Sequence, residues 1–232
     1  MSSKQKLKNL AKAINYSGLD LIRLTPKQEQ FYKMIRNNEI TIGMGFAGTA
    51  KTFVACYAAL RLLSEGKYRK IILTKPIQEA GEKLGFLPGD VDEKIGPYME
   101  SFILTIQKMI GEESTLSLIE HEIIEMRPLA YMRGATFDQS ILIGDESQNC
   151  DMRQLMLHVT RKGENSKMII IGDVTQTDIA KKKSGLMQFA NMINGIDGID
   201  IFRFNREDIV RSKILIEITD RYDKWKEDNN HE

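Results

Sequence analysis

The feature that most constrains the fold is a run of small residues at positions 45–52, Gly-Phe-Ala-Gly-Thr-Ala-Lys-Thr, directly after an apolar run at 40–42. A strand, a loop of this kind and a helix form a phosphate-binding loop, in which backbone N–H groups crowd around a triphosphate. The helix expected at 53–64 would point its positive end at the same anion. We therefore predict that a nucleoside triphosphate contacts Gly45, Phe46, Ala47, Gly48, Thr49, Ala50, Lys51 and Thr52.

Two side chains of this loop have specific predicted roles. Lys51 would reach the β- and γ-phosphates, and the Thr52 hydroxyl would bind Mg²⁺. Ala50 stands where the motif usually has glycine, and a left-handed backbone there would cost alanine about 1–2 kcal/mol. Glycine-rich turns also occur for packing alone, so the loop by itself leaves that alternative open.

Short apolar, β-branched runs alternate with helical patterns along the chain. The pattern predicts strands at 40–42, 70–74, 123–127, 141–144, 168–172 and 199–204, and helices at 26–36, 53–64, 97–111, 115–122, 152–161, 184–193 and 208–226. Continuous apolar strands separated by helices indicate an α/β fold with a mainly parallel sheet covered on both faces. We expect one domain over 22–226, a basic arm at 1–21 and a polar tail at 227–232.

Two of the expected strands end in acidic residues, at the sheet edge where α/β proteins bind ligands. Asp145 would hold Mg²⁺, directly or through water, and Glu146 would orient and deprotonate the attacking water. Asp173 ends the other strand, and Gln176 just beyond it would hydrogen-bond the γ-phosphate or the lytic water. Solvated turn residues give the same pattern.

Arginines near such a site matter because phosphoryl transfer concentrates negative charge at the γ-phosphate. Arg206 and Arg211 lie just after the last expected strand. Either would serve as an arginine finger, in cis or to a neighbouring copy. Ordinary surface arginines are the alternative.

Composition narrows the class of protein. The net charge of +1 gives no global basic field of the kind that marks nucleic-acid binding, although a local patch is compatible with it. Cys56 and Cys150 lie far apart and indicate packed, reduced thiols in a cytoplasmic protein. The three histidines form no metal-binding pattern, and no apolar run approaches the ~18–20 residues of a membrane span.

Taken together, the ordered motifs resemble those of the PhoH-like proteins, a family of P-loop ATPases related to the core domain of superfamily 1 helicases. The resemblance covers residues 22–224 and rests on segments at 25–28, 45–52, 74–90, 128–134, 145–149, 172–176 and 208–211. It implies a RecA-like fold, ATP and Mg²⁺ as ligands, and ATP hydrolysis. It also implies that Gln28 reads the adenine and that Gln148 belongs to the hydrolysis network. Two departures bear on the strength of this activity: Ala50 replaces a glycine, and Ala135 stands where an arginine commonly follows Gly134.

The same resemblance implies a link to RNA or another single-stranded nucleic acid. Residues 75–90 follow the second expected strand, where related motors touch a nucleic-acid backbone. Lys75 and Lys83 would contact phosphates there, and Phe86 and Tyr131 would stack on bases. Surface solvation and loop anchoring are the plainer explanations for these four side chains.

A superfamily 1 motor needs two core domains, and this chain has the pattern of one. We therefore expect a homo-oligomer. In a ring of copies, Arg211 of one copy would act as the arginine finger in trans for the next copy. Two alternatives stay open. One is a nucleotide-dependent interaction module without translocation, and the other is a ribonuclease that uses Asp145 and Asp173.

Overall fold

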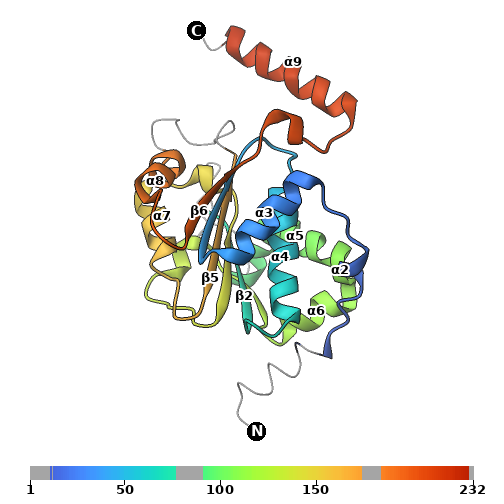
Figure 1. The fold of residues 1–232 in the computed structure, drawn as a ribbon, viewed down its shortest axis with the longest axis vertical. Helices are drawn as coiled ribbons and strands as arrows, with labels where there is room; N and C mark the ends of the chain where they lie inside the picture. Colours follow the sequence, from blue (N-terminus) through green and yellow to red (C-terminus); the bar gives the residue numbers. More distant parts are fainter. Residues whose placement is uncertain (1–10, 12, 77–90, 174–183, 230–232) are drawn as a thin grey trace.

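The strands form one parallel sheet in the computed structural model, which describes residues 11, 13–76, 91–173 and 184–229. Within these residues the sheet has six strands in the order β3-β2-β4-β5-β1-β6, and every neighbouring pair is parallel (Figure 1). The strands are β1 (Ile40–Met44), β2 (Lys70–Thr74), β3 (Ile124–Met126), β4 (Ser140–Gly144), β5 (Lys167–Gly172) and β6 (Ile199–Arg203). The predicted α/β, RecA-like class is confirmed.

Helices cover both faces of this sheet. Figure 1 shows α2 to α6 on one side and α7 and α8 on the other, with α9 beyond the body of the domain. The helices are α2 (Gly18–Leu21), α3 (Pro26–Asn37), α4 (Lys51–Ser64), α5 (Val91–Ile110), α6 (Glu112–Glu120), α7 (Met152–Val159), α8 (Leu186–Ile193) and α9 (Lys213–Asn229). Short 3₁₀ turns are η2 (Leu129–Met132), η3 (Ser147–Asn149) and η4 (Arg206–Asp208).

The strand sequences are continuously apolar because each face of the sheet packs against helices. On β5, Ile169 and Ile171 belong to the core shared with α3 to α6, while Met168 and Ile170 belong to the core under α7 and α8. All four side chains are fully buried. A strand buried on both faces has no solvent side on which polar residues would alternate.

The predicted starts of α5 and α9 differ most from the structure. Helix α5 begins at Val91 and not at Pro97, and residues 91–96 form its first turns. Helix α9 begins at Lys213 and not at Asp208. Before it, Asn205 and Asp208 form a capping box around η4, and residues 209–212 run on without helix.

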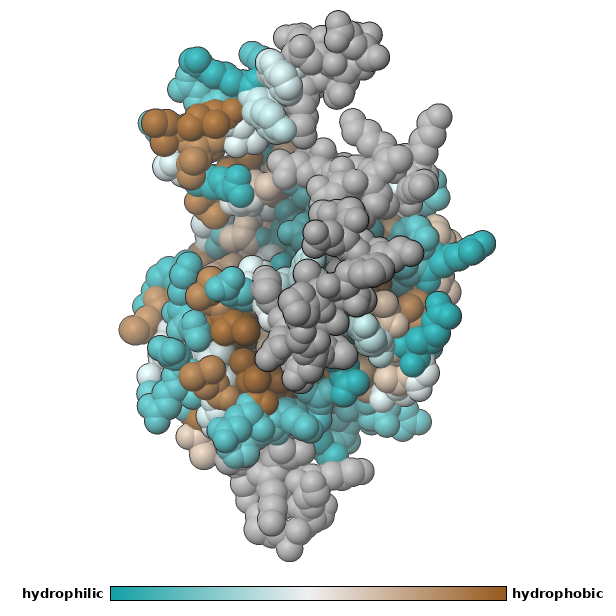
Figure 2. All heavy atoms as spheres, turned by 180° about the vertical axis from the view of Figure 1, so that it is seen from behind, coloured by the Kyte–Doolittle hydropathy of each residue, from teal (hydrophilic) through white to brown (hydrophobic). Residues whose placement is uncertain are grey.

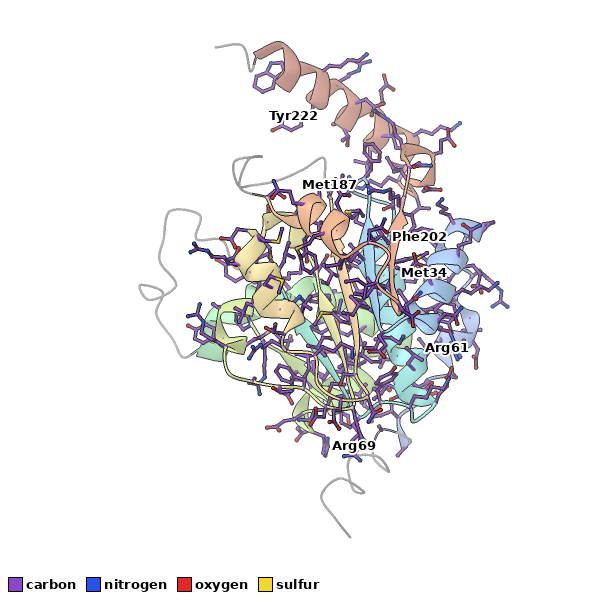
Figure 3. The ribbon with its side chains drawn as sticks, turned by 60° about the vertical axis from the view of Figure 1, so that its left-hand side comes forward. Met34, Arg61, Arg69, Met187, Phe202 and Tyr222 are labelled. Atoms are coloured by element: carbon purple, nitrogen blue, oxygen red, sulfur yellow. The ribbon has the colours of Figure 1, made fainter. Side chains whose placement is uncertain are left out.

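Helix α3 starts where the sequence predicts. Thr25 and Gln28 form a capping box, and Pro26 occupies the first turn. Arg61 of α4 then holds the segment before α3, since its guanidinium pairs with Asp20 at 2.7 Å and donates to the Leu19 carbonyl at 2.8 Å (Arg61 is labelled in Figure 3).

An aromatic cluster joins α3 to the sheet beside the phosphate loop. The Phe31 ring lies 5.2 Å from both Phe202 and Phe204, centroid to centroid. Figure 3 shows Phe202 on β6, on the side of the sheet that α3 and its Met34 cover. A methyl group added to Gly43 of β1 would lie 2.5 Å from the Phe31 ring, so the close approach of this helix depends on that glycine.

We predict that Gly43→Ala lowers the free energy of unfolding by about 1–3 kcal/mol, because the added methyl overpacks the ring. Gly96→Ala is the matched control, since Gly96 lies in α5 and no atom of the described residues lies within 4 Å of its added methyl, so this variant should not be destabilised. Urea unfolding measures both. Phe31→Leu should relieve part of the Gly43→Ala cost in the double variant, and a strictly additive pair would contradict the proposed contact.

Candidate functional site

A cleft of about 340 Å³ opens at the carboxyl ends of β1, β4 and β5. This is the edge at which parallel α/β sheets bind ligands. The cleft is lined by Ala47, Gly48, Ala50, Lys51, Thr52, Phe53, Thr105, Asp145, Glu146, Gln148, Gly172, Asp173 and Arg211. The structure therefore brings most of the predicted site residues into one space.

The phosphate loop between β1 and α4 is held by backbone bonds at several points. The Gly45 N–H donates to the Gly172 carbonyl at 3.3 Å, and the Gly48 carbonyl accepts from the Val210 N–H at 2.9 Å. Thr49 is buried, and its hydroxyl donates to the Phe46 carbonyl at 2.9 Å. Ala50 adopts the left-handed conformation, with φ 63° and ψ 30°, at the residue before α4. The strained alanine considered from the sequence is thus present.

Lys51 places its ammonium at the loop itself. Its Nζ donates to the Gly45 carbonyl at 2.8 Å and to the Phe46 carbonyl at 2.7 Å. Burial lowers the pKa of Lys51, and the carboxylates of Asp173, Asp145 and Glu146 act in the opposite direction. The ammonium therefore lies at the loop where the sequence predicts that the triphosphate binds.

Thr52 and Asp145 bring two oxygen ligands together from opposite parts of the sheet. The Thr52 hydroxyl, in the first turn of α4, donates to Asp145 Oδ2 at 3.0 Å. The Glu146 N–H donates to Asp145 Oδ1 at 2.9 Å, which fixes the carboxylate plane. Hydroxyl and carboxylate oxygens suit Mg²⁺, which usually takes one or two carboxylates together with substrate phosphates. These two residues therefore fit the predicted metal site.

Glu146 begins a chain of hydrogen bonds that spans the back of the cleft. Gln148 Nε2 donates to Glu146 Oε2 at 2.6 Å, and Gln148 Oε1 accepts from the Asp173 N–H at 2.9 Å. Burial, and secondarily the negative charge of Asp145, raises the pKa of Glu146, while the bond from Gln148 acts against that rise. A carboxylate at the cleft with a raised pKa is a suitable general base.

The two candidate arginines have different surroundings. Arg211 lies against the phosphate loop of its own chain, because a methyl group added to Gly48 would meet Arg211 Nε at 2.6 Å. Arg206 forms an ion pair with Asp220 of α9. The geometry thus places Arg211 in cis at the cleft, and a finger in trans stays a prediction.

Other predicted residues lie elsewhere. Gln28 is buried in the capping box of α3, where its Oε1 accepts from the Thr25 N–H at 3.0 Å, and it is not among the residues that line the cleft. Tyr131 is 54% exposed on η2. Gln176, Lys83 and Phe86 lie outside the described residues.

Sequence reasoning gave no role at this site to Phe53 or Thr105, which both line the cleft. Asp173 was expected at this edge as an acid that ends a strand. Thr105 comes from the middle of α5, and no motif marks it. Lys75 was assigned to nucleic acid, but its ammonium faces Asp145 at 3.6 Å.

This fold and this cleft define a P-loop nucleotide-binding protein, with a loop lysine, a hydroxyl and an acidic pair at the carboxyl edge of a parallel sheet. The sequence pattern of the family described as PhoH-like protein matches residues 21–223. The chain therefore belongs to the PhoH-like family.

Curated relatives agree with this assignment. The PhoH-like protein of Bacillus subtilis (strain 168) is 43% identical over 211 residues, which cover 90% of this chain and 66% of that protein. Protein PhoH of Escherichia coli (strain K12) is 35% identical over 190 residues, which cover 81% of this chain and 54% of that protein. The chain thus spans two thirds or less of the length of these relatives.

Among solved structures, the chain is similar to the Pif1 helicase from Candida albicans, with a TM-score of 0.40 and 15% identity over 80% of this chain and 40% of that one. Bacteroides Pif1 bound to ssDNA gives a TM-score of 0.34 and 13% identity over 84% of this chain and 45% of that one. The likeness is distant, and the fold assignment stands on the order and direction of the strands. Among the described helices, none has both the length and the apolar character that crossing a membrane requires.

We predict that Ala50→Gly raises the free energy of unfolding by about 0.5–1 kcal/mol, because relief of the left-handed strain exceeds the entropy that glycine adds to the unfolded chain. Ala47→Gly is the matched control in the same loop, since Ala47 is not among the alanines with positive φ and should lose stability. Thermal unfolding of both variants measures the difference. Equal losses in the two would show that the loop does not strain Ala50.

Proposed function

We propose that this protein binds ATP with Mg²⁺ and hydrolyses it. The observation that carries the proposal is the contact between Thr52 and Asp145, because it joins the phosphate loop to the acidic strand end at one point. Lys51, Glu146 and Arg211 surround that point in the same cleft. Membership of the PhoH-like family supports the choice of a nucleotide ligand.

In this proposal the loop binds and orients the triphosphate. Its backbone N–H groups and the Lys51 ammonium contact the phosphate oxygens. Thr52 and Asp145 hold Mg²⁺, which neutralises part of the charge that develops on the phosphates. The preference for adenine rests on the family resemblance alone, since the Gln28 carboxamide accepts from the Thr25 N–H and Gln28 does not line the cleft.

Glu146 takes the proton from the attacking water. Its raised pKa improves it as a base, and Gln148 holds one of its oxygens so that the carboxylate keeps its orientation. Gln148 in turn is tied to the backbone of Asp173 at the end of β5. Arg211 stabilises the negative charge that builds up in the transition state, from a position against Gly48 of its own chain.

We further propose that hydrolysis is coupled to RNA, or another single-stranded nucleic acid. Tyr131 supports this, because it exposes an aromatic ring on η2 and the Leu129 N–H of that turn bonds the Lys75 carbonyl at 3.3 Å. An exposed ring beside the segment after β2 suits stacking on an unpaired base.

A homo-oligomer is the assembly that we propose for this activity. Helix α9 carries exposed apolar residues at the three- and four-residue spacing of a helix seam, namely Leu215, Ile218, Tyr222 and Trp225. Figure 2 shows hydrophobic surface gathered near the top of the molecule, where this helix lies. An exposed apolar helix face favours burial against a second copy.

We expect Lys51→Ala to lose both ATP binding and turnover, because the loop keeps no side-chain cation. Glu146→Gln should keep ATP binding but reduce turnover by about 10²–10⁴-fold, as loss of a general base does. Phosphate release and binding of a fluorescent ATP analogue measure the two effects. Lys67→Ala is the control, since Lys67 pairs with Glu65 at 2.8 Å away from the cleft. Wild-type turnover in both cleft variants would refute the proposal.

Single-stranded RNA should stimulate ATP turnover in the wild-type protein, and Tyr131→Ala should weaken RNA binding by about 5–100-fold through loss of one stacked base. Tyr98→Ala is the control, because Tyr98 is also exposed but lies on α5. Turnover that RNA leaves unchanged would favour the interaction module. RNA cleavage by Lys51→Ala without nucleotide would favour the ribonuclease.

A further inference from the structure

Lys75 lies one residue beyond β2, where it meets the metal-site carboxylate. Its Nζ is 3.6 Å from Asp145 Oδ2, the same oxygen that accepts the Thr52 hydroxyl at 3.0 Å. The Lys75 side chain is 14% exposed and that of Asp145 is 7% exposed. The ion pair is thus largely removed from water, where charge interactions are stronger than at a surface.

Helix α5 holds the Lys75 ammonium in this position. Nζ donates to Ser101 Oγ at 2.7 Å, and it lies 5.0 Å from the centre of the fully buried Phe102 ring. A hydroxyl and an aromatic face are both favourable partners for a cation. The approach to Asp145 is therefore built by two elements, β2 and α5, and is not a chance contact of a mobile side chain.

Asp145 needs such a cation because a buried carboxylate without one is costly. Lys51, which lines the cleft, directs its hydrogen bonds to the carbonyls of Gly45 and Phe46. We propose that Lys75 is a positioning residue. Its positive charge compensates the Asp145 carboxylate and keeps that carboxylate oriented in the absence of metal, and Mg²⁺ would compete with Lys75 for Asp145. This inference rests on the proposed Mg²⁺·nucleotide site.

The competition has a structural consequence. Because the Lys75 ammonium is also bonded to Ser101, the metal and α5 act on the same group. Binding of Mg²⁺ at Asp145 would free Lys75 from the carboxylate and leave it to α5 alone. The metal site is in this way linked to the helix that supplies Thr105 to the cleft.

The first test measures the coupling in the metal-free protein. Lys75→Met keeps the length of the side chain and its packing on Phe102 but removes the charge. It should lower the midpoint of thermal unfolding by about 5 °C in EDTA, the scale expected for breaking a partly buried ion pair. In an Asp145→Asn background the same change should lower the midpoint much less. An additive pair would overturn the inference, whether or not nucleotide binds.

The second test measures competition with the metal. Mg²⁺ should tighten binding of a fluorescent ADP in Lys75→Met by about five- to tenfold more than in wild type, because the competing charge is gone. Lys70→Met is the matched control. Lys70 begins β2, the strand that Lys75 follows, and it pairs with the half-buried Glu125, so this variant should lose stability with no change in the Mg²⁺ effect.

The outcomes separate this inference from the proposed function. An equal or smaller Mg²⁺ effect in Lys75→Met would overturn the inference while ADP binding still supports the nucleotide site. If neither protein binds the fluorescent ADP, the nucleotide site fails. In that case the inference is tested by the change that Mg²⁺ alone causes in the midpoint of thermal unfolding. If this change is no larger in Lys75→Met than in wild type, the inference is overturned.

Discussion

The hydrogen bond between Thr52 and Asp145 is the contact on which the rest of the site depends. Strands β1 and β4, which lead to these residues, are not neighbours, since β5 lies between them. The bond therefore closes across the end of a third strand, and this is possible because that strand ends in glycine. A methyl group on Gly172 would lie 2.9 Å from both the backbone nitrogen and the side-chain oxygen of Gln148. The acidic turn thus reaches the phosphate loop through space that a larger residue would fill.

The sheet, the phosphate loop and the acidic residues after β4 could be predicted from sequence because local or repeated sequence patterns encode them. β2 and β5 are continuous apolar runs with turn residues after them, and Asp145 follows such a run directly. The start of α9 could not be predicted in this way. The capping box of Asn205 and Asp208 is a valid helix start by local rules, yet it forms only the turn η4, because the next residues are engaged by the phosphate loop.

The roles of Lys75 and Thr105 were beyond sequence reasoning for a different reason. Both depend on how α5 packs against the end of β2, and the start of that helix was itself predicted at residue 97 instead of 91. From the sequence alone, a lysine that follows a strand is interpreted as a surface residue. Its contact with Ser101 becomes visible only when the position of α5 is known. Long-range packing, not local pattern, decides which side of the sheet edge its ammonium occupies.

The segment after β6 joins the nucleotide site to the exposed helix. The Phe204 N–H bonds the Met44 carbonyl at 2.8 Å, just before the phosphate loop, and the Val210 N–H bonds the Gly48 carbonyl at 2.9 Å, in the middle of that loop. Arg211 then lies on Gly48, and the ion pair between Arg206 and Asp220 fixes the first turns of α9 to the same segment. A triphosphate that draws Arg211 toward its terminal phosphate would move the backbone just before the N-terminal end of α9. Because that helix carries the apolar seam proposed for a second copy, the nucleotide and the assembly would act on each other through one short piece of backbone, and by linkage each would alter the affinity of the other.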